Sequence, residues 1–124
     1  MLNVESIVHV VDNTGAKTAK CIKILLPVTS KGYKTGRVGK LILVSVQKVL
    51  PEKKIKKGLK YKAIIVSVKQ TIIRQIGNVK LNKNNIVLLN KNNEPLGTRL
   101  NSYIVKEVRE AGFIKLISLA EGII

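Results

Sequence analysis

Apolar residues in this chain gather in runs of strand length, and turn-forming residues separate one run from the next. The longest runs, LILVSV at 41–46 and AIIVSV at 63–68, are far shorter than the roughly 20 residues that a membrane-spanning helix needs. Both are rich in β-branched residues, which favour strands. With 124 residues, 45% of them hydrophobic, the chain is long and apolar enough to enclose a core. We therefore predict a single domain that is mainly β.

Two segments carry the strongest strand patterns. KLILVSVQKVL at 40–50 alternates apolar and polar side chains, which predicts a strand with one buried face. In LKYKAIIVSVKQ at 59–70, the part at 63–68 is apolar on both faces. That pattern is typical of a closed sheet that is filled inside and also covered outside.

The first half of the chain also predicts a hairpin and two basic turns. Residues 6–11 and 16–25 are rich in Val, Ile, Thr and Ala, and the turn-forming sequence DNTG separates them. PVTSKGYKTGRVG at 27–39 has glycines and cations without a sustained period, so we expect a basic surface loop there. PEKKIKKG at 51–58 ends the preceding strand at its proline and turns the chain at its glycine.

The second half continues with a ribbon, a strand and turns. TIIRQIGNVKL at 71–81 predicts a projecting ribbon with Gly77-Asn78 at its tip, and NIVLLN at 85–90 predicts a further strand. In KNNEPLG, Pro95 and Gly97 fit the second and fourth positions of a type I turn.

The spacing of the apolar residues changes from a strand period to a helical period toward the end of the chain. SYIVKEVREAG at 102–112 predicts a single short helix, with Asn101 or Ser102 as its N-cap and Gly112 as its stop. FIKLISLAEGII at 113–124 is expected to be a strand or a pair of turns that packs back on the body. The whole is predicted to be a small β-barrel over about residues 1–100 with a short helical extension over about residues 101–124.

The charge of the chain limits its partners. Lys and Arg number 23 against 7 for Asp and Glu, so the formal net charge is +16 and the pI is about 10.2. Such an excess repels itself unless an anionic partner neutralises it, which indicates nucleic acid or an acidic membrane surface. A membrane is the weaker choice because the apolar runs are short, and MLNVESIVHVV lacks the features of a signal peptide.

The sequence offers little material for catalysis or metal binding. Cys21 is the one thiol and His9 the one imidazole, so the chain has neither an internal disulfide nor a Cys/His metal cluster, and Cys21 is expected to be a buried structural residue. The carboxylates are scattered, and GYKTGRVG matches neither a phosphate-binding loop nor a dinucleotide fingerprint. We therefore expect no enzyme activity, no cofactor and no metal.

The kind of nucleic-acid recognition can be narrowed further. Readers of single-stranded RNA stack bases on aromatic side chains, but aromatic residues make up 3% of this chain. Lysines on strands and in loops suit contacts to the phosphates of RNA that is already folded. Each lysine by itself also fits an ordinary solvated surface.

Several stretches together resemble one family, the universal large-subunit ribosomal protein fourteen. They are VVDNTGAKTAKCIKIL at 10–25, the KKG of IKKG, IVLLNKNNEPLGTRL at 86–100, VRE and KLISLAE, and they occur in the family's order over essentially the whole chain. The resemblance implies a five-stranded barrel with a C-terminal helical extension, seated on large-subunit rRNA at the face that meets the small subunit. It also implies contacts with ribosomal proteins three and nineteen of the large subunit and bridges to small-subunit rRNA.

The resemblance and the charge pattern together nominate two sets of site residues. Thr98, Arg99, Lys115 and Ser118 would form the patch that family members offer to the ribosome silencing factor, which blocks subunit joining. The residues expected to face rRNA are Asn13, Lys17, Lys20, Lys31, Lys34, Arg37, Lys53, Lys54, Lys56, Lys57, Arg74 and Lys80.

The sequence leaves more than one cellular compartment and more than one role open for this protein. Asn, Lys and Ile are abundant, and their AT-rich codons suit an organelle genome, while the segment SLAEGII resembles mitochondrial members. We expect a mitochondrial ribosome, with a plastid or an AT-rich bacterium as alternatives. Beside the role of structural ribosomal component in translation, a free-standing basic barrel that regulates or assists translation by binding RNA or DNA stays open.

Overall fold

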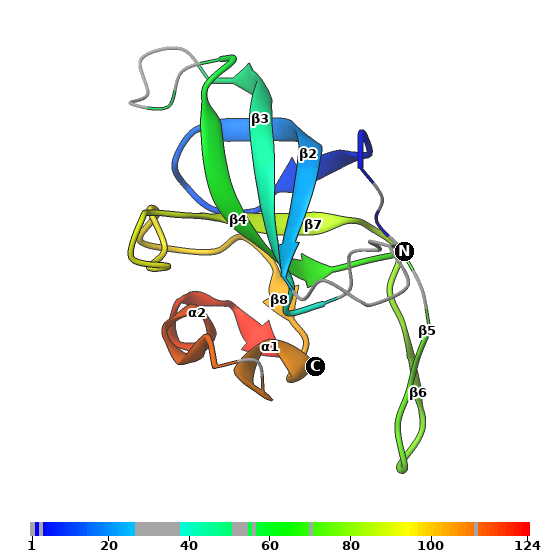
Figure 1. Cartoon of the computed structure of the whole chain (residues 1–124). Coiled ribbons are helices and arrows are strands. Elements are labelled where there is room, and N and C mark those ends of the chain that lie inside the picture. Colours follow the sequence, from blue (N-terminus) through cyan, green and yellow to red (C-terminus); the bar gives the residue numbers. More distant parts are fainter. Residues whose placement is uncertain are drawn as a thin grey trace.

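Five strands close into a barrel (Figure 1). The computed structural model describes residue 2 and residues 4–26, 38–50, 55, 57–69, 71–110 and 112–124. The barrel strands are β1 (Ile7–Val10), β2 (Ala16–Leu26), β3 (Leu41–Val49), β4 (Lys60–Ser67) and β7 (Asn85–Leu89), in the order β1-β2-β3-β4-β7. Neighbours are antiparallel except β1 and β7, which pair in parallel and close the barrel. The predicted five-stranded barrel and its first hairpin are confirmed.

Alternate side chains of these strands fill the barrel. On β3 the buried residues Ile42, Val44 and Val46 alternate with partly exposed ones, as the sequence pattern predicts. Cys21 of β2 is fully buried among them, which confirms its predicted burial. We call this group the barrel core; its further members include Val8, Ala19, Ala63, Ile65, Ile86 and Leu88.

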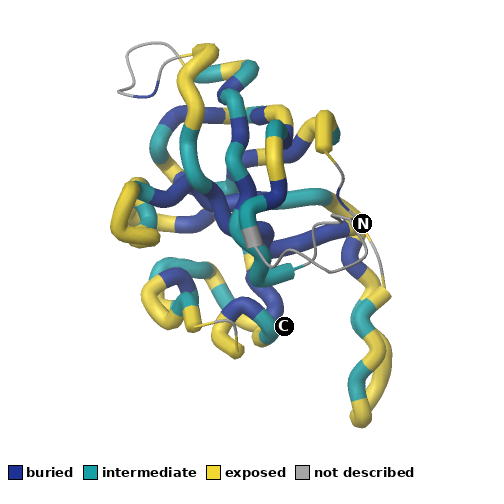
Figure 2. The backbone as a smooth tube through the Cα atoms, in the orientation of Figure 1, coloured by how far each residue is buried: buried dark blue, intermediate teal, exposed yellow. Residues whose placement is uncertain are grey.

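Strand β4 from residue 63 onward and most of strand β7 are buried on both faces. The outward side chains of Ile64 and Val66 on β4, and of Val87 and Leu89 on β7, are covered by the C-terminal extension. We call this second group the outer cluster; it includes Leu100, and the extension contributes Ile104, Val105, Val108 and Leu116 to it. Figure 2 shows the buried stretch where the extension meets the barrel. The prediction that this sheet is filled inside and covered outside is confirmed, and each such side chain contributes roughly 1.5–3 kcal/mol.

The extension differs from its prediction in two places. Tyr103–Ile104 forms strand β8, which pairs in parallel with β9 (Gly122–Ile123), so the helix α1 is confined to Glu107–Glu110. The proposed caps at 101 and 102 are therefore wrong, whereas Gly112 ends α1 with a φ of 97°. Residues 114–119 form a second helix, α2 (Ile114–Leu119), and not a strand, because that arrangement buries Leu116 in the outer cluster.

Two turns lie elsewhere than the sequence predicts. The ribbon consists of β5 (Thr71–Ile73) and β6 (Asn78–Lys80), and Asn78 already pairs with Ile73. Its tip is thus the loop 74–77, closed by the Arg74 N–H donating to the Gly77 carbonyl at 3.2 Å. After β7 the hydrogen-bonded turn is Asn90–Asn93, with the Asn93 N–H donating to the Asn90 carbonyl, and Pro95 bridges back to Leu89.

Candidate nucleic-acid interface

Lysines form two rows across the outer face of β2, β3 and β4. In the first row Lys20 lies opposite Ser45, and Ser45 lies opposite Lys60. In the second row Lys23 and Lys62 flank Leu43 in the same way. Directly opposite residues point to the same face of a sheet. Because Val44 and Val46 point into the barrel core, both rows face outward. We call these four lysines the lysine rows.

The spacing of the lysine rows suits a polyanion. Lysines two strands apart are separated by about 10 Å at Cα, and the two rows by about 7 Å along β3. Two such charges repel by only about 0.4 kcal/mol in water, so the free protein tolerates them. Toward the extension the same outer face becomes apolar, where Leu41 and Ile64 pack into the outer cluster. On this face the cationic part of the sheet therefore ends where the outer cluster begins.

The predicted partner patch is assembled from two segments. Thr98 and Arg99 lie in the loop after β7, Lys115 and Ser118 lie on α2, and all four are exposed. The Leu100 N–H donates to the Leu119 carbonyl at 3.1 Å, which fastens the loop beside the end of α2. Lys115 Nζ lies 2.7 Å from Glu94 Oε1, and this ion pair lowers the pKa of Glu94.

The side chain of Asn13 forms hydrogen bonds to the loop after β7, a role that the sequence did not indicate. Its Oδ1 accepts the N–H of Thr98 at 2.8 Å and that of Arg99 at 3.3 Å, and its Nδ2 donates to Thr98 Oγ1 at 2.7 Å. Gly97 permits this approach, since a Cβ there would lie 2.6 Å from Asn13 Oδ1. An Asn side chain so engaged positions the loop, and its contact with rRNA stays a prediction.

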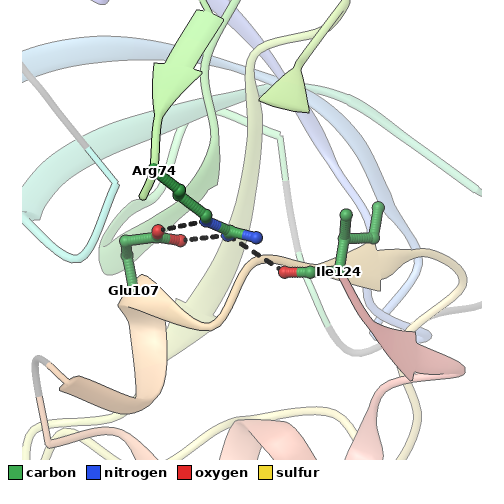
Figure 3. A network of polar contacts seen from close by, with 3 residues as sticks. All are labelled: Arg74, Glu107 and Ile124. Atoms are coloured by element: carbon green, nitrogen blue, oxygen red, sulfur yellow. Dashed lines mark hydrogen bonds and ion pairs between the residues drawn. The ribbon is translucent and has the colours of Figure 1, made fainter. Parts of the chain in front are cut away.

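Arg74 is likewise engaged within the chain (Figure 3). Its Nε and Nη2 donate to the two carboxylate oxygens of Glu107 at 2.9 and 2.7 Å, and Nη2 also donates to the Ile124 carbonyl at 3.0 Å. The hydrogen bond from Arg74 lowers the pKa of Glu107, and the bond to Glu107 raises the pKa of Arg74. A residue predicted to face rRNA is thus committed to an ion pair, and its rRNA contact stays a prediction.

The family model for ribosomal protein L14p/L23e matches residues 1–124. The chain belongs to the ribosomal protein L14p/L23e family. Membership places it in a ribosome as a structural, non-enzymatic component that binds rRNA and neighbouring ribosomal proteins. A mainly β fold with a closed five-stranded barrel agrees with that assignment.

Of the other residues predicted to contact rRNA in this L14p/L23e chain, Lys17, Lys57 and Lys80 are exposed. The residues Lys31, Lys34, Arg37, Lys53, Lys54 and Lys56, and most of the predicted basic loop at 27–39, lie outside the described residues.

Sequence reasoning missed three members of the lysine rows, Lys23, Lys60 and Lys62. A signal was present for two of them, because residues 60 and 62 of one strand share a face. Which neighbours they would meet depends on strand register, and the register in β2 shifts between Cys21 and Lys23. No sequence period reveals such a shift.

The buried carboxylate of Asp12 is held by hydrogen bonds within the fold. Asp12 is 5% exposed, and its carboxylate accepts hydrogen bonds from Thr14 N–H, Thr14 Oγ1 and the Leu88 N–H. Burial raises the pKa of Asp12 above its ordinary value, although these bonds act in the opposite direction. Among the described residues no group of three His, Cys, Asp or Glu could hold a metal ion. In the same part of the chain no helix is long and apolar enough to cross a membrane.

Proposed function

We propose that this L14p/L23e-family protein binds large-subunit rRNA through the lysine rows. The position of these four lysines on one face is the observation that supports the proposal. They place four cations on one face whose partly buried centre consists of Leu43 and Ser45. Of the described aromatic residues, Tyr61 and Phe113 pack against the two apolar groups, and Tyr103, which is 57% exposed, belongs to β8 of the extension and not to the strands of the lysine rows. Base stacking therefore has little part in this surface. Contacts of this kind hold folded RNA by its phosphates.

Exposed residues around the rows extend the proposed rRNA surface. Lys17 lies at the start of β2, Lys57 before β4 and Lys80 at the end of β6. The loop cations at 31, 34, 37, 53, 54 and 56 belong to the same proposal by their sequence. Asn13 and Arg74 differ, because their side chains make several short bonds to other parts of the chain, whereas Lys62 of the rows has a long contact of 3.5 Å from its Nζ to Asn93 Oδ1.

The exposed patch of Thr98, Arg99, Lys115 and Ser118 is proposed as the face toward partners. In the family resemblance, this patch lies where the large subunit meets the small subunit. We infer that it contributes to bridges with small-subunit rRNA and binds the ribosome silencing factor. Ribosomal proteins three and nineteen of the large subunit are the proposed neighbours. The single domain, with its barrel and extension, is the unit that carries both surfaces.

The proposed compartment is the mitochondrial matrix, within the mitochondrial ribosome. Its support is compositional: the abundance of Asn, Lys and Ile and the segment SLAEGII at 118–124. A plastid ribosome or that of an AT-rich bacterium is the alternative. Fractionation of cells that carry a tagged copy distinguishes the three.

Sedimentation tests the proposal against a free-standing translation factor. A structural component, which RNA and neighbouring ribosomal proteins hold in place, stays with large subunits after a moderate salt wash, whereas a factor held by phosphate contacts alone loses affinity as salt rises and is released. Recovery mainly in the soluble fraction would overturn the proposed role.

The lysine rows have a sharper test with a matched control. Lys20→Gln with Lys60→Gln removes two charges from the rows, and Lys91→Gln with Lys106→Gln removes two exposed charges elsewhere. With protein-free large-subunit rRNA as the probe, each lost phosphate contact lowers the slope of log affinity against log salt by about 0.7–0.9. We expect the first pair to lower the slope and the second to leave it unchanged. Equal slopes for the two pairs would remove the rows from the interface.

A further inference from the structure

The ribbon of β5 and β6 needs support from the rest of the chain to keep its position. Its strands have three residues each, and an isolated two-stranded hairpin is marginally stable in water. Ile73 is 84% exposed and Ile76 is 99% exposed, so the outer part of the ribbon stands in solvent. Figure 1 shows the ribbon projecting from the barrel. Whatever holds it must lie nearer its base.

Two sets of contacts hold the ribbon to the rest of the chain. Ile72 and Val79 lie opposite each other and pack against the outer cluster, which contains Val108 of α1. Beyond this apolar pair, the guanidinium of Arg74 donates hydrogen bonds to both carboxylate oxygens of Glu107. The same Arg74 nitrogen that binds Glu107 Oε2 reaches the Ile124 carbonyl (Figure 3).

We propose that Arg74 is a positioning residue, which fixes the ribbon against α1 and the residue at 124, and is not itself a phosphate ligand. The bidentate arrangement is geometrically demanding, because two N–H groups of a planar fork must meet two carboxylate oxygens. The pair is also sheltered, with side-chain exposures of 15% for Arg74 and 25% for Glu107. It therefore fixes an orientation as well as a distance.

The electrostatics of the site argue against a phosphate at Arg74. Glu107 compensates the charge of the guanidinium, and Glu110 lies near enough to act on it as well. A phosphate that approached Arg74 would meet two carboxylates. Lys80, at the end of β6, is exposed and is the ribbon cation best placed for RNA. This assignment of roles to Arg74 and Lys80 rests on the proposed rRNA binding, whereas the anchoring of the ribbon does not.

Distance measurements between spin labels test the anchoring directly. Labels at Ile76→Cys on the ribbon tip and Lys48→Cys on β3 report the position of the ribbon, and the native Cys21 is fully buried and escapes labelling. We expect a single narrow distance distribution that broadens in Arg74→Gln and broadens less in Glu107→Gln, because the contact of Arg74 with Ile124 remains in the second variant. The double variant should match Arg74→Gln, because Glu107 has already lost its Arg74 partner there. Lys80→Gln should leave the distribution narrow. A distribution that stays narrow in Arg74→Gln would overturn the proposal.

The salt dependence of RNA binding then separates positioning from phosphate contact. With protein-free large-subunit rRNA as the probe, Lys80→Gln should lower the log–log slope by about 0.7–0.9. Arg74→Gln should keep the wild-type slope while affinity falls roughly threefold to tenfold, the cost of ordering the ribbon on binding. An equal loss of slope in Arg74→Gln would make Arg74 a phosphate ligand. If the wild-type protein showed no salt dependence, the proposed rRNA binding would fail, and the label distances would still decide the anchoring.

Discussion

The side-chain oxygen of Asn13 accepts the main-chain N–H of Thr98 at 2.8 Å, across a sequence separation of 85. The turn between β1 and β2 therefore holds the loop after β7, which carries half of the proposed partner patch. The same oxygen accepts the Arg99 N–H, and the Asn13 amide donates to Thr98 Oγ1. The barrel thus fixes the backbone from which the exposed Arg99 projects.

Asn13→Ala should loosen this loop without unfolding the barrel. We expect a loss of about 1–2 kcal/mol in the free energy of unfolding, the size of a few neutral hydrogen bonds at a partly solvated site. Hydrogen exchange should become faster at the Thr98 and Arg99 amides, while the amide of Ile65 in the barrel stays protected. Gly97→Ala should act in the same way, because its Cβ would displace the Asn13 oxygen.

Asn90→Ala is the matched control for that experiment. Asn90 Oδ1 also accepts two main-chain N–H groups, those of Asn92 and Glu94, but within its own turn. Its loss should speed exchange at Asn92 and Glu94 and leave Thr98 unchanged. Identical exchange patterns in the Asn13 and Asn90 variants would contradict a specific link from Asn13 to the patch.

Arg99→Ala should leave the fold intact and weaken subunit joining or the binding of the silencing factor. Arg99 is exposed on a loop whose backbone is held by other groups, so its side chain has little to contribute to stability. Thermal melting of the isolated protein and a subunit-joining assay measure the two effects. Arg109→Ala, which removes an exposed arginine from α1, is the control. A clear fall in the melting temperature of the isolated Arg99→Ala protein, beside the loss of joining, would show that Arg99 is structural.

Ile65→Asp should unfold the barrel. Ile65 is fully buried in the barrel core, and an unpaired carboxylate there costs at least about 4 kcal/mol. Ile73→Asp makes the same chemical change at a side chain that is 84% exposed, and it should stay within about 0.5 kcal/mol of the native protein. Circular dichroism during thermal melting compares the two. Unaltered melting of Ile65→Asp would refute its placement inside the barrel.

The contribution of the Arg74–Glu107 pair should depend on pH. Because the folded protein holds the pKa of Glu107 below its unfolded value of about 4.3, the pair stabilises the fold above that pH and is lost as pH falls through the folded pKa. Urea unfolding of the native protein and of Glu107→Gln measures this term as a difference. The raised pKa of Asp12, whose contribution is lost as pH rises, and the lowered pKa of Glu94 are common to both proteins and cancel. A difference that grew on acidification would show that Glu107 is not stabilised as a carboxylate.

The sequence by itself determined the barrel and its chemistry. The alternation of Ile42, Val44 and Val46 and the doubly apolar segment 63–68 predicted strands that the structure confirms. These features are local, because a period of two residues fixes which face of a strand is buried. The net charge of +16 and the scarcity of aromatic residues indicated a phosphate-binding surface in the same way, from composition.

The tertiary structure decided the extension and the exact composition of both surfaces. Tyr103–Ile104 became a strand because Gly122–Ile123 lies beside it, and residues 114–119 became a helix because that buries Leu116. Local preferences at such positions differ by only about 0.7 kcal/mol or less per residue, so burial against distant elements outweighs them. The partners of Asn13 and Arg74 also depend on the tertiary structure. Asn13 binds Thr98 and Arg74 binds Glu107, and each pair is far apart in the sequence, so only folding brings the two residues together.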